Sequence, residues 1–457
     1  MKKIIFITIV LFYSCSLDLP VEDEITGIDA IDELLTAQEA LSSIYLSYPK
    51  NRILFSKLAD DFYPNHTISD NPFDYNLYRW NTQELLFESN ALWADYYKTI
   101  SKANLLINSV DNIQTNNTDE KAQLDFIHAQ ALSLKALSYL NLIEIYAPAY
   151  SSESRDKDGI ILKNDINSEE ISRASLEISL AETEQLLLKA IDLFSDSNST
   201  TFRINKSSAT ASLAKLYLMW QKYDEAITLC DTLLSNNLNL ESFTNLWRTP
   251  ENNPEVLLAF ENRTFNYSAI FDPSFQEYEY YLNFNIQFTN NDYRKDISYF
   301  TEDFTLLNNS VIQANFIAKY YSSNPNISVE NAAPIAYIRT AELYFIKAEA
   351  AAKNNNNTLA LNTLNAFLTL RNADQITNPT DLIQEILKEK QREFFGEGLR
   401  YFDLKRNNLD IIKVTFRNNS NETTISSDDF RWLLPIPLEE ITNNSKAKQN
   451  PEWESII

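Results

Sequence analysis

Asp60 and Asp61 are adjacent carboxylates, a pair that in some hydrolytic enzymes supplies both an acid and a base. Glycoside hydrolysis needs two carboxyl groups placed about 5–10 Å apart across a substrate cleft. Adjacency in the sequence does not establish that geometry. Catalysis, contact with a ligand or cation, and a polar role at a helix end therefore all stay open for this pair. His66, in the polar loop that follows, is a candidate ligand contact.

Charged side chains recur every third residue in a second group, made up of Glu397, Arg400, Asp403 and Arg406. On a helix, this spacing places opposite charges on adjacent turns as ion pairs. Gly398 lies within the group and would let a neighbouring helix approach closely, at a cost of about 1 kcal/mol in helix propensity. We therefore expect a packed, ion-paired structural element here and not an acid–base site.

The composition excludes several classes of site. The chain has 457 residues but only four glycines, against a usual share of about 7%. Phosphate-binding loops need closely spaced glycines before a helix, and the only close pair is Gly396 and Gly398. Two histidines and two cysteines form no zinc motif, so we expect neither a cofactor nor a metal. With so little glycine, turns must rely on Asn, Asp, Ser and the 14 prolines.

The charge balance argues against nucleic acid as a partner. Lys and Arg number 39 while Asp and Glu number 63, which gives a formal net charge of −24. Phosphate binding needs clustered basic residues, so a neutral ligand fits this chain better than an anionic one.

The N-terminus has the features of a secretory signal. Met1-Lys2-Lys3 is followed by an apolar run from Ile4 to Tyr13 and then by Ser14-Cys15, which resembles a bacterial lipoprotein signal. We expect residues 1–14 to be a lipoprotein signal peptide, residues 15–30 to be an acidic tether that begins with a lipidated Cys15, and residues 31–457 to be one ligand-binding domain. An ordinary signal peptide is the alternative.

Most of the remaining chain has the period of amphipathic helices. The pattern predicts helices over Lys121–Tyr146 and Leu176–Phe194, and two helical hairpins, Ser207–Trp220 with Tyr223–Asn236 and Ile338–Lys353 with Thr358–Arg371. Each hairpin has roughly the 34-residue length of a tetratricopeptide repeat, but the two are far apart in the sequence. We predict a mainly α fold, a tetratricopeptide-like helical hairpin scaffold with large irregular, aromatic-rich loop insertions.

Two polar and aromatic stretches, 60–80 and 247–299, are the segments where we expect a ligand. Sugar rings stack their C–H faces on aromatic planes, while their hydroxyls need polar partners. The candidates in the first stretch are Asp61, His66, Tyr75, Asn76, Tyr78, Arg79 and Trp80, with Trp80 as the expected stacking platform. Those in the second, which could hold a hairpin over 280–288, are Tyr281, Asn283, Phe284, Tyr293 and Arg294. The alternative is that the two stretches simply pack against each other.

Several motifs occur in the order in which one family has them. Trp93 to Asn104 matches W-x-x-x-Y-x-x-I-x-x-A-N, and Arg339 to Ala350 resembles R-x-A-E-x-x-L-x-x-A-E-A. The string from Glu389 to Arg406, which includes Arg392 and Glu393, is similar to E-R-x-x-E-x-x-x-E-G-x-R-W-F-D-L-x-R. Taken together, these motifs make the chain resemble the SusD/RagB outer-membrane nutrient-binding lipoproteins of Bacteroidetes.

This resemblance implies a function without chemistry. A lipid-anchored protein exposed on the outer membrane would bind a nutrient, above all a glycan, and deliver it to a SusC-like TonB-dependent barrel. The charged string from Arg392 to Arg406 would be architectural. The alternatives are a peptide-binding member of the same family, a tetratricopeptide-type protein-interaction scaffold and, least expected, a surface glycosidase.

Overall fold

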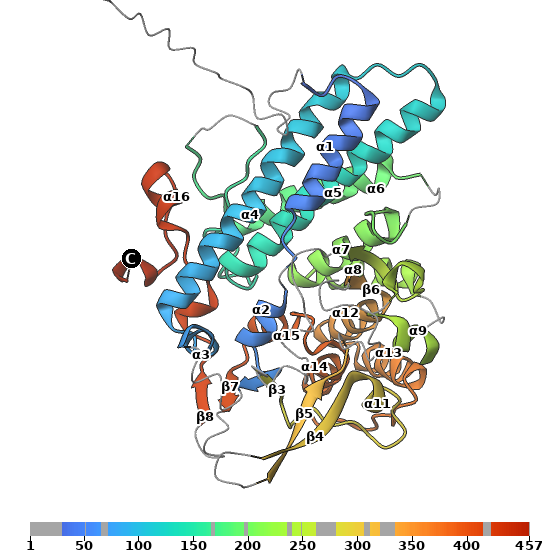
Figure 1. Cartoon of the computed structure of the whole chain (residues 1–457), viewed down its shortest axis with the longest axis vertical. Coiled ribbons are helices and arrows are strands. Elements are labelled where there is room, and N and C mark those ends of the chain that lie inside the picture. Colours follow the sequence, from blue (N-terminus) through green and yellow to red (C-terminus); the bar gives the residue numbers. More distant parts are fainter. Residues whose placement is uncertain are drawn as a thin grey trace, which may run out of the picture.

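The structure is a computed structural model that describes residues 30–456, apart from residues 51, 65–71, 166–169, 196–199, 235–239, 248, 262–279, 306–310, 320–333 and 415–421. The fold is mainly helical, as the sequence predicts (Figure 1). The largest hydrophobic cluster begins at Ile31 and ends at Trp453, so both ends of the described chain contribute to one core. Of the helices that the structure describes, none has the length and hydrophobicity needed to cross a bilayer.

Four helices form the upper layer in Figure 1: α1 (Leu34–Ser47), α4 (Thr82–Ser109), α5 (Thr118–Tyr146) and α6 (Leu176–Leu193). The last two confirm the helices predicted over 121–146 and 176–194. Side-chain caps fix where α4, α5 and α6 begin: Asn81, Asn117 and Ser175 each accept a hydrogen bond from a first-turn backbone N–H. Because α1, α4 and α6 surround α5, all of its last twenty residues are buried.

Both predicted hairpins are present. They consist of α7 (Lys206–Met219) with α8 (Tyr223–Leu233) and α12 (Thr340–Lys353) with α13 (Asn357–Leu370). Although they are far apart in the sequence, α8 packs on α12, so the hairpins lie side by side. Ala226 and Ala348 are fully buried there, and Lys347 binds Asp231 across the contact (Nζ–Oδ1 2.5 Å). The two hairpins thus stack on each other through α8 and α12, as successive repeats would.

Shorter elements complete the chain. The remaining helices are α2 (Ile53–Leu58), α3 (Pro72–Tyr78), α9 (Leu240–Asn245), α11 (Lys295–Ser298), α14 (Leu382–Phe394), α15 (Arg400–Arg406) and α16 (Leu438–Asn443). Short 3-10 turns occupy Val110–Asn112, Pro250–Asn252, Phe430–Trp432 and Trp453–Ser455. Asparagine replaces glycine at several left-handed turn positions, as expected from the composition: Asn355, Asn372, Asn378 and Asn408 have φ values of 61°, 52°, 50° and 52°.

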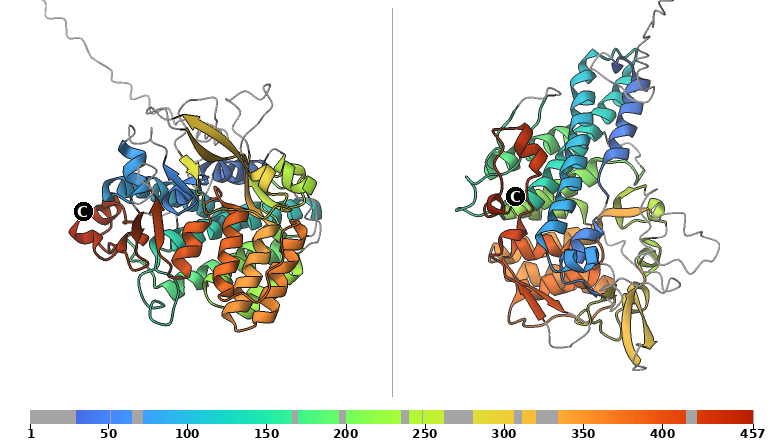
Figure 2. Two further views of the ribbon diagram at one scale, coloured as in Figure 1. Left: turned by 90° about the horizontal axis from the view of Figure 1, so that it is seen from below. Right: turned by 60° about the vertical axis from the view of Figure 1, so that its left-hand side comes forward.

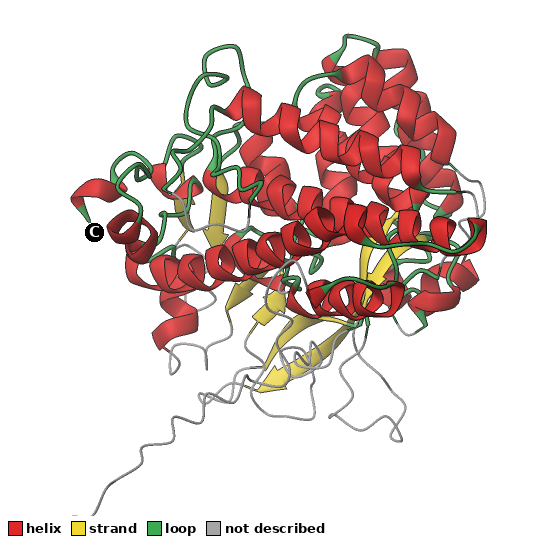
Figure 3. Cartoon of the chain, turned by 90° about the horizontal axis from the view of Figure 1, so that it is seen from above, coloured by secondary structure: helices red, strands yellow, loops and turns green. Residues whose placement is uncertain are grey.

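The described strands form antiparallel pairs, most of which lie along one side of the helical layer (Figure 3). The pairs are β1 (Phe62–Pro64) with β3 (Tyr280–Leu282), β2 (Val256–Phe260) with β6 (Ile335–Arg339), β4 (Tyr299–Thr305) with β5 (Val311–Ile317), and β7 (Ile411–Val414) with β8 (Glu422–Ile425). The β4–β5 pair extends away from the helices (Figure 2). The hairpin expected over 280–288 is wrong, because β3 pairs with the distant β1 instead.

The glycine-containing string folds differently from the continuous helix that its spacing suggests. The chain leaves α14 at Phe394 and enters α15 at Arg400, and both Gly396 and Gly398 have left-handed φ values, of 77° and 76°. A Cβ atom at Gly398 would lie 2.2 Å from the carbonyl oxygen of Arg52, at the start of α2. The expected close approach at Gly398 is therefore confirmed, although a turn makes it and not a helix.

The charges around this turn pair mainly with distant segments. Glu393 accepts hydrogen bonds from Arg339 (2.8 Å), Arg371 (2.9 Å) and Arg294 (3.3 Å), and all four side chains are almost completely buried. Burial alone would raise the pKa of the Glu393 carboxyl, but the guanidinium groups of Arg371, Arg339 and Arg294 hold it well below its ordinary value. We call these four residues, with Glu397, Lys319 and Glu255, which bind them, the buried ionic cluster.

The rest of the charged string is also paired. Arg400 binds Asp60 (Nε–Oδ1 2.8 Å), and Arg406 binds Glu349 of α12 (2.6 Å). Among the described residues of the string itself, Asp403 and Arg406 make the expected three-residue pair (2.8 Å). The expected structural role agrees with this pairing, but most partners come from elsewhere in the fold.

Replacing Gly398 with alanine tests the close approach. We expect Gly398→Ala to lower the free energy of unfolding by roughly 2–4 kcal/mol, because it adds a clash with the Arg52 backbone to the strain of a left-handed alanine. Urea denaturation followed by circular dichroism measures this. Gly396→Ala carries the same backbone strain and serves as the comparison; equal losses in both variants would contradict a specific contact with Arg52.

Candidate functional site

The two stretches in which a ligand was expected meet through the β1–β3 pair. Tyr63 lies opposite Tyr281 with ring centroids 5.3 Å apart, and Phe316 of β5 covers them at 5.3 Å from Tyr281. On the other face, Tyr280 packs against Tyr78 of α3 at 6.4 Å. Both faces of this small sheet are therefore occupied, by β5 on one side and by α3 on the other.

The structure corrects the expectation for Trp80. Its side chain is fully buried, its Nε1–H donates to the carbonyl oxygen of Leu58 (2.9 Å), and its ring meets Trp432 edge to face at 5.0 Å. Trp80 lies just after α3 with a left-handed φ of 58°, which turns the chain and directs the indole inward. A ring with no exposed face cannot stack on a ligand, so Trp80 belongs to the core.

Other candidates are buried as well. Tyr78 and Tyr281 are at most 1% exposed, so neither offers a ring face to a ligand. Asn283 uses its side-chain amide and its backbone N–H to bind the carbonyl oxygens of Asp60 (2.7 Å) and Asp61 (2.8 Å). Asn283 thus extends the β1–β3 pairing toward the end of α2 and acts as a structural residue.

The adjacent carboxylates have opposite electrostatic environments. Burial alone would raise the pKa of Asp60. The positive charge and two hydrogen bonds of Arg400 (2.8 and 3.0 Å) outweigh burial, so the pKa lies below its ordinary value. Asp61 is fully buried, and its burial together with the neighbouring charge of Asp60 raises its pKa to about 6, although Ser56 and the Gly396 N–H oppose the shift. Asp61 is inaccessible and Asp60 is bound to Arg400. Of the three roles considered for this pair, the arrangement therefore favours a polar structural role at the helix end over catalysis or ligand contact.

Arg294, the basic candidate of the stretch 247–299, belongs to the buried ionic cluster. Arg294 is fully buried and binds Asp292 (2.6 Å), Glu389 and Glu393. The half-buried Tyr293 donates its hydroxyl to the carbonyl oxygen of Leu370 (2.5 Å). Both side chains therefore already have structural partners.

The candidates that remain accessible lie mainly on α3. Tyr75 and Asn76 are half-buried, and the exposed Arg79 places its guanidinium 5.6 Å from the Tyr75 ring. Asn76 is oriented by a hydrogen bond to Glu84 (3.1 Å). Phe284, after β3, is 48% exposed and lies 6.2 Å from Tyr63. Cys15 and His66 lie outside the described residues, so their expected roles stay predictions.

A further aromatic pair beside α3, with one exposed and one half-buried ring, is not among the candidates predicted from the sequence. Phe73 of α3 and Phe87 of α4 meet edge to face at 5.4 Å, and Phe87 is 63% exposed. The signal was present, since Phe87 falls among the exposed positions of an amphipathic helix. We call Phe73, Tyr75, Asn76, Arg79 and Phe87 the α3 surface.

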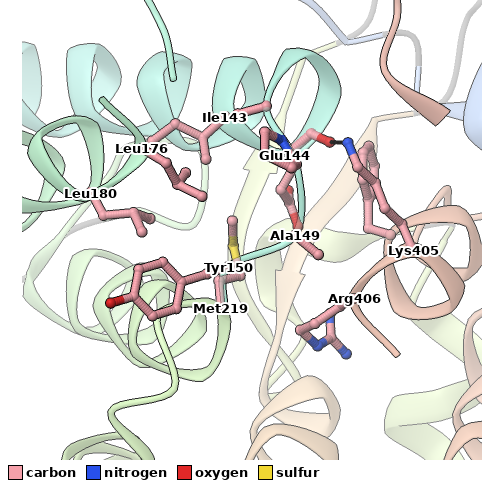
Figure 4. Close-up of a pocket in the computed structure, with 12 residues that line it drawn as sticks. Ile143, Glu144, Ala149, Tyr150, Leu176, Leu180, Met219, Lys405 and Arg406 are labelled. Carbon is pink, nitrogen blue, oxygen red and sulfur yellow. Dashed lines mark hydrogen bonds between the residues drawn. The ribbon is translucent and has the colours of Figure 1, made fainter. Parts of the chain in front are cut away.

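A narrow pocket lies where α5, α6, α7 and α15 meet (Figure 4). Its apolar wall includes Leu176, Leu180 and Met219, and its polar edge contains Lys405, which donates to the backbone oxygen of Glu144 (2.6 Å). Burial lowers the pKa of Lys405 to about 7. The pocket has a volume of about 40 Å³, room for roughly three water molecules, so it is too small for a sugar ring.

A larger groove lies between α4 and α16. Its volume is about 330 Å³, within the range of ligand sites, and its lining includes Asn90 and Trp93 from α4 and Leu438 and Asn443 from α16. The groove is not evident in the sequence, because its two walls are hundreds of residues apart in the chain.

Comparison with known proteins gives consistent matches along the chain. Residues 186–453 match the model of the SusD family, and residues 22–218 match a model described as "Starch-binding associating with outer membrane". The chain is 21% identical to the SusD-like protein P38 of Formosa agariphila, over 98% of this chain and 97% of that protein.

Solved structures share the fold. A SusD superfamily protein from Bacteroides thetaiotaomicron has a TM-score of 0.75 at 22% identity, covering 92% of this chain and 100% of the other. Surface glycan-binding protein A from Bacteroides fluxus has a TM-score of 0.70 at 18% identity, covering 91% and 99%. The expected fold is therefore confirmed.

The buried Asp61 leads to a pH-dependent prediction. Because the fold raises the pKa of Asp61 from 3.8 to about 6, its contribution to stability is full below about pH 4 and is lost as the pH rises through 6. Relative to Asp61→Asn, which keeps an acceptor for the Gly396 N–H, wild type should lose roughly 3 kcal/mol of unfolding free energy between pH 4 and pH 7.

Urea denaturation at several pH values measures this difference. Asp60→Asn tests the electrostatic part of the shift, because it removes the neighbouring charge that helps to raise the pKa of Asp61, and it should therefore reduce the loss between pH 4 and pH 7. The stabilisation by Asp60 itself, whose pKa is lowered, is lost only below about pH 4. If the curves for Asp61→Asn and wild type run parallel from pH 4 to pH 7, the assignment of a raised pKa to Asp61 is wrong.

Proposed function

Because this chain belongs to the SusD family, we propose that it binds an oligosaccharide nutrient at the cell surface and passes it to a SusC-like TonB-dependent barrel. The description of the second matching model, which names starch binding and the outer membrane, supports this proposal, as does the fold shared with a surface glycan-binding protein. The observation that carries the proposal is the α3 surface, where aromatic, amide and guanidinium groups remain accessible together.

The chemistry of the α3 surface suits a sugar chain. The Tyr75 ring can pack against the C–H face of a pyranose, while Asn76 and Arg79 can bond to its hydroxyl groups. Asn76 is held by Glu84, which reduces the entropy lost when a ligand binds. Two or three contacts at about 1 kcal/mol each, with hydrogen bonds, fit the millimolar to micromolar affinity that surface capture needs, roughly −4 to −8 kcal/mol.

The proposed function is binding without catalysis. Asp60 is engaged by Arg400, and Asp61 is fully buried, so this pair does not offer two open carboxyl groups to a glycosidic bond. What the protein contributes is recognition and transfer. Any conversion of the glycan belongs to other proteins.

The expected placement on the membrane completes the proposal. Removal of residues 1–14 would leave a lipidated Cys15, and residues 15–30 would connect that anchor to the domain formed by residues 31–457. This arrangement holds the α3 surface near the membrane without any need for a spanning helix.

Ligand affinity should depend on the exposed face of α3. A microarray of glycans and peptides, probed with residues 16–457, identifies the ligand, and calorimetry then measures its affinity. We expect Arg79→Ala and Tyr75→Ala each to weaken binding about 5–10-fold, or about 1–1.4 kcal/mol, because each removes one direct contact.

Tyr150→Ala, at the narrow pocket, is the control and should bind as wild type does. Trp80→Ala should instead lower the melting temperature, because it removes a buried side chain. Binding of peptides alone, or unchanged glycan affinity in both α3 variants, would overturn the proposal for this surface.

The lipid anchor has a separate test. We expect Cys15→Ala to move the protein from the membrane fraction to the soluble fraction, because the acyl chains would be lost. Detergent-free fractionation and immunoblotting measure the distribution. A serine substitution at Cys230, which is buried in α8, is the control and should leave the protein in the membrane fraction.

A further inference from the structure

We propose that the groove between α4 and α16 is a second carbohydrate subsite, which takes a neutral sugar residue. It is separate from the α3 surface and is argued from its own lining. Its volume of about 330 Å³ is enough for a pyranose ring with part of a neighbouring ring, unlike the narrow pocket at Lys405.

The walls of the groove have the two kinds of surface that a sugar needs. Asn90 on α4 and Asn443 on α16 are exposed amides, each able to donate and accept hydrogen bonds with hydroxyl groups. Apolar surface comes from the exposed Ala94 and from Leu438, which is 53% exposed, while Pro437 between the walls is buried. The C–H face of a sugar can pack on this surface while its hydroxyls reach the amides.

The floor of the groove is built to hold its shape. The indole Nε1–H of Trp93 donates to Glu440 Oε2 (3.3 Å), and Asn444 donates to Glu440 Oε1 (2.8 Å). Ser89 of α4 donates to the carbonyl oxygen of Pro435 (2.6 Å), which ties the helix to the segment before α16. Because the two walls are already joined, little conformational entropy is lost when a ligand binds in the groove.

The charges of the lining select against an acidic ligand. The described residues that line the groove include Glu439 and Glu440 but no lysine or arginine. A uronate or sulfate group placed between two carboxylates would be repelled, and it would find no cation to compensate its desolvation. The ligand class is therefore a neutral sugar, whose hydroxyls can donate hydrogen bonds to these carboxylates.

The exposed face of α4 connects the groove with the α3 surface. Phe87, Asn90 and Ala94 follow one another at intervals of three and four residues, so they lie on one face of the helix. All three are exposed, and Phe87 contacts Phe73 of α3. A sugar chain bound at α3 can therefore follow α4 to the groove, and two linked subsites bind a long chain more tightly than either alone.

The test observes the groove directly through the indole N–H signal of Trp93 in NMR spectra, assigned with Trp93→Phe. The probes are maltohexaose, cellohexaose, xylohexaose and mannohexaose, with hexagalacturonate as the acidic probe, each at about 10 mM so that a weak subsite is occupied. We expect at least one neutral hexasaccharide to shift the Trp93 signal and hexagalacturonate to leave it unchanged.

Ala94→Trp fills the groove from an exposed helix position, and it should weaken the ligand-dependent shift at least tenfold. Ser101→Trp is the matched control, because it places the same side chain at an exposed position of α4 two turns beyond the lining, on the side away from the α3 surface, and it should behave as wild type does. A Trp93 signal that no neutral probe shifts, an equal shift with hexagalacturonate, or a shift that survives in Ala94→Trp would each overturn the proposal.

The same titrations separate this proposal from the proposed function. If calorimetry detects hexasaccharide binding that Arg79→Ala weakens while the Trp93 signal stays fixed, the α3 surface is a binding site and the groove is not. If the Trp93 signal shifts equally in wild type and Arg79→Ala, and no binding depends on Arg79, the groove stands and the α3 surface does not.

Discussion

Glu393 is buried among three arginines, and this set of ion pairs joins segments that are far apart in the chain. Arg294 precedes α11, Arg339 ends β6 and lies just before α12, and Arg371 follows α13, so one carboxylate ties three distant segments to α14. Removing these charges from water is expensive, and only a nearly complete set of partners offsets that cost. The cluster also fixes the end of α14. From there the turn at Gly396 and Gly398 reaches α2, and Arg400 reaches Asp60.

The need to give every buried polar group a partner also explains why many polar side chains of the loops are buried. Lys413 donates to the carbonyl oxygens of Leu58 and Ala59, which α2 leaves without helical partners at its end, and Trp80 also binds Leu58. Asn283 likewise donates its side-chain amide to the backbone carbonyl oxygen of Asp60. Insertions into a helical scaffold must satisfy their own backbone groups, and here an ammonium, an indole and an amide group do so. Among the described residues of the two aromatic stretches, those that stay accessible to a ligand lie mainly on the outer face of α3.

Features that depend on residues close together in the sequence could be predicted, and features that depend on distant residues could not. The helices α5 to α8, the α12–α13 hairpin and the close contact at Gly398 were predictable, because periodicity, small residues and the family motif are local signals. The burial of Trp80 and Arg294 was not, because Trp432 and Glu393, their partners, are far away in the chain. Nor does a periodic pattern show that α8 packs on α12 or that α16 forms a groove with α4.

The pairing of β1 with β3 has a consequence for the order in which the molecule is built. Residues 62–64 join residues 280–282, which closes a loop of roughly two hundred residues, whereas α4 meets α5 across a short connection. Contacts between such distant segments form slowly, and local helix pairs form fast. We therefore expect the helical layer to assemble first and the strand pair beside α3 to form among the last native contacts. A chain interrupted before residue 280 would contain the four helices of the upper layer without the strand against which α3 packs.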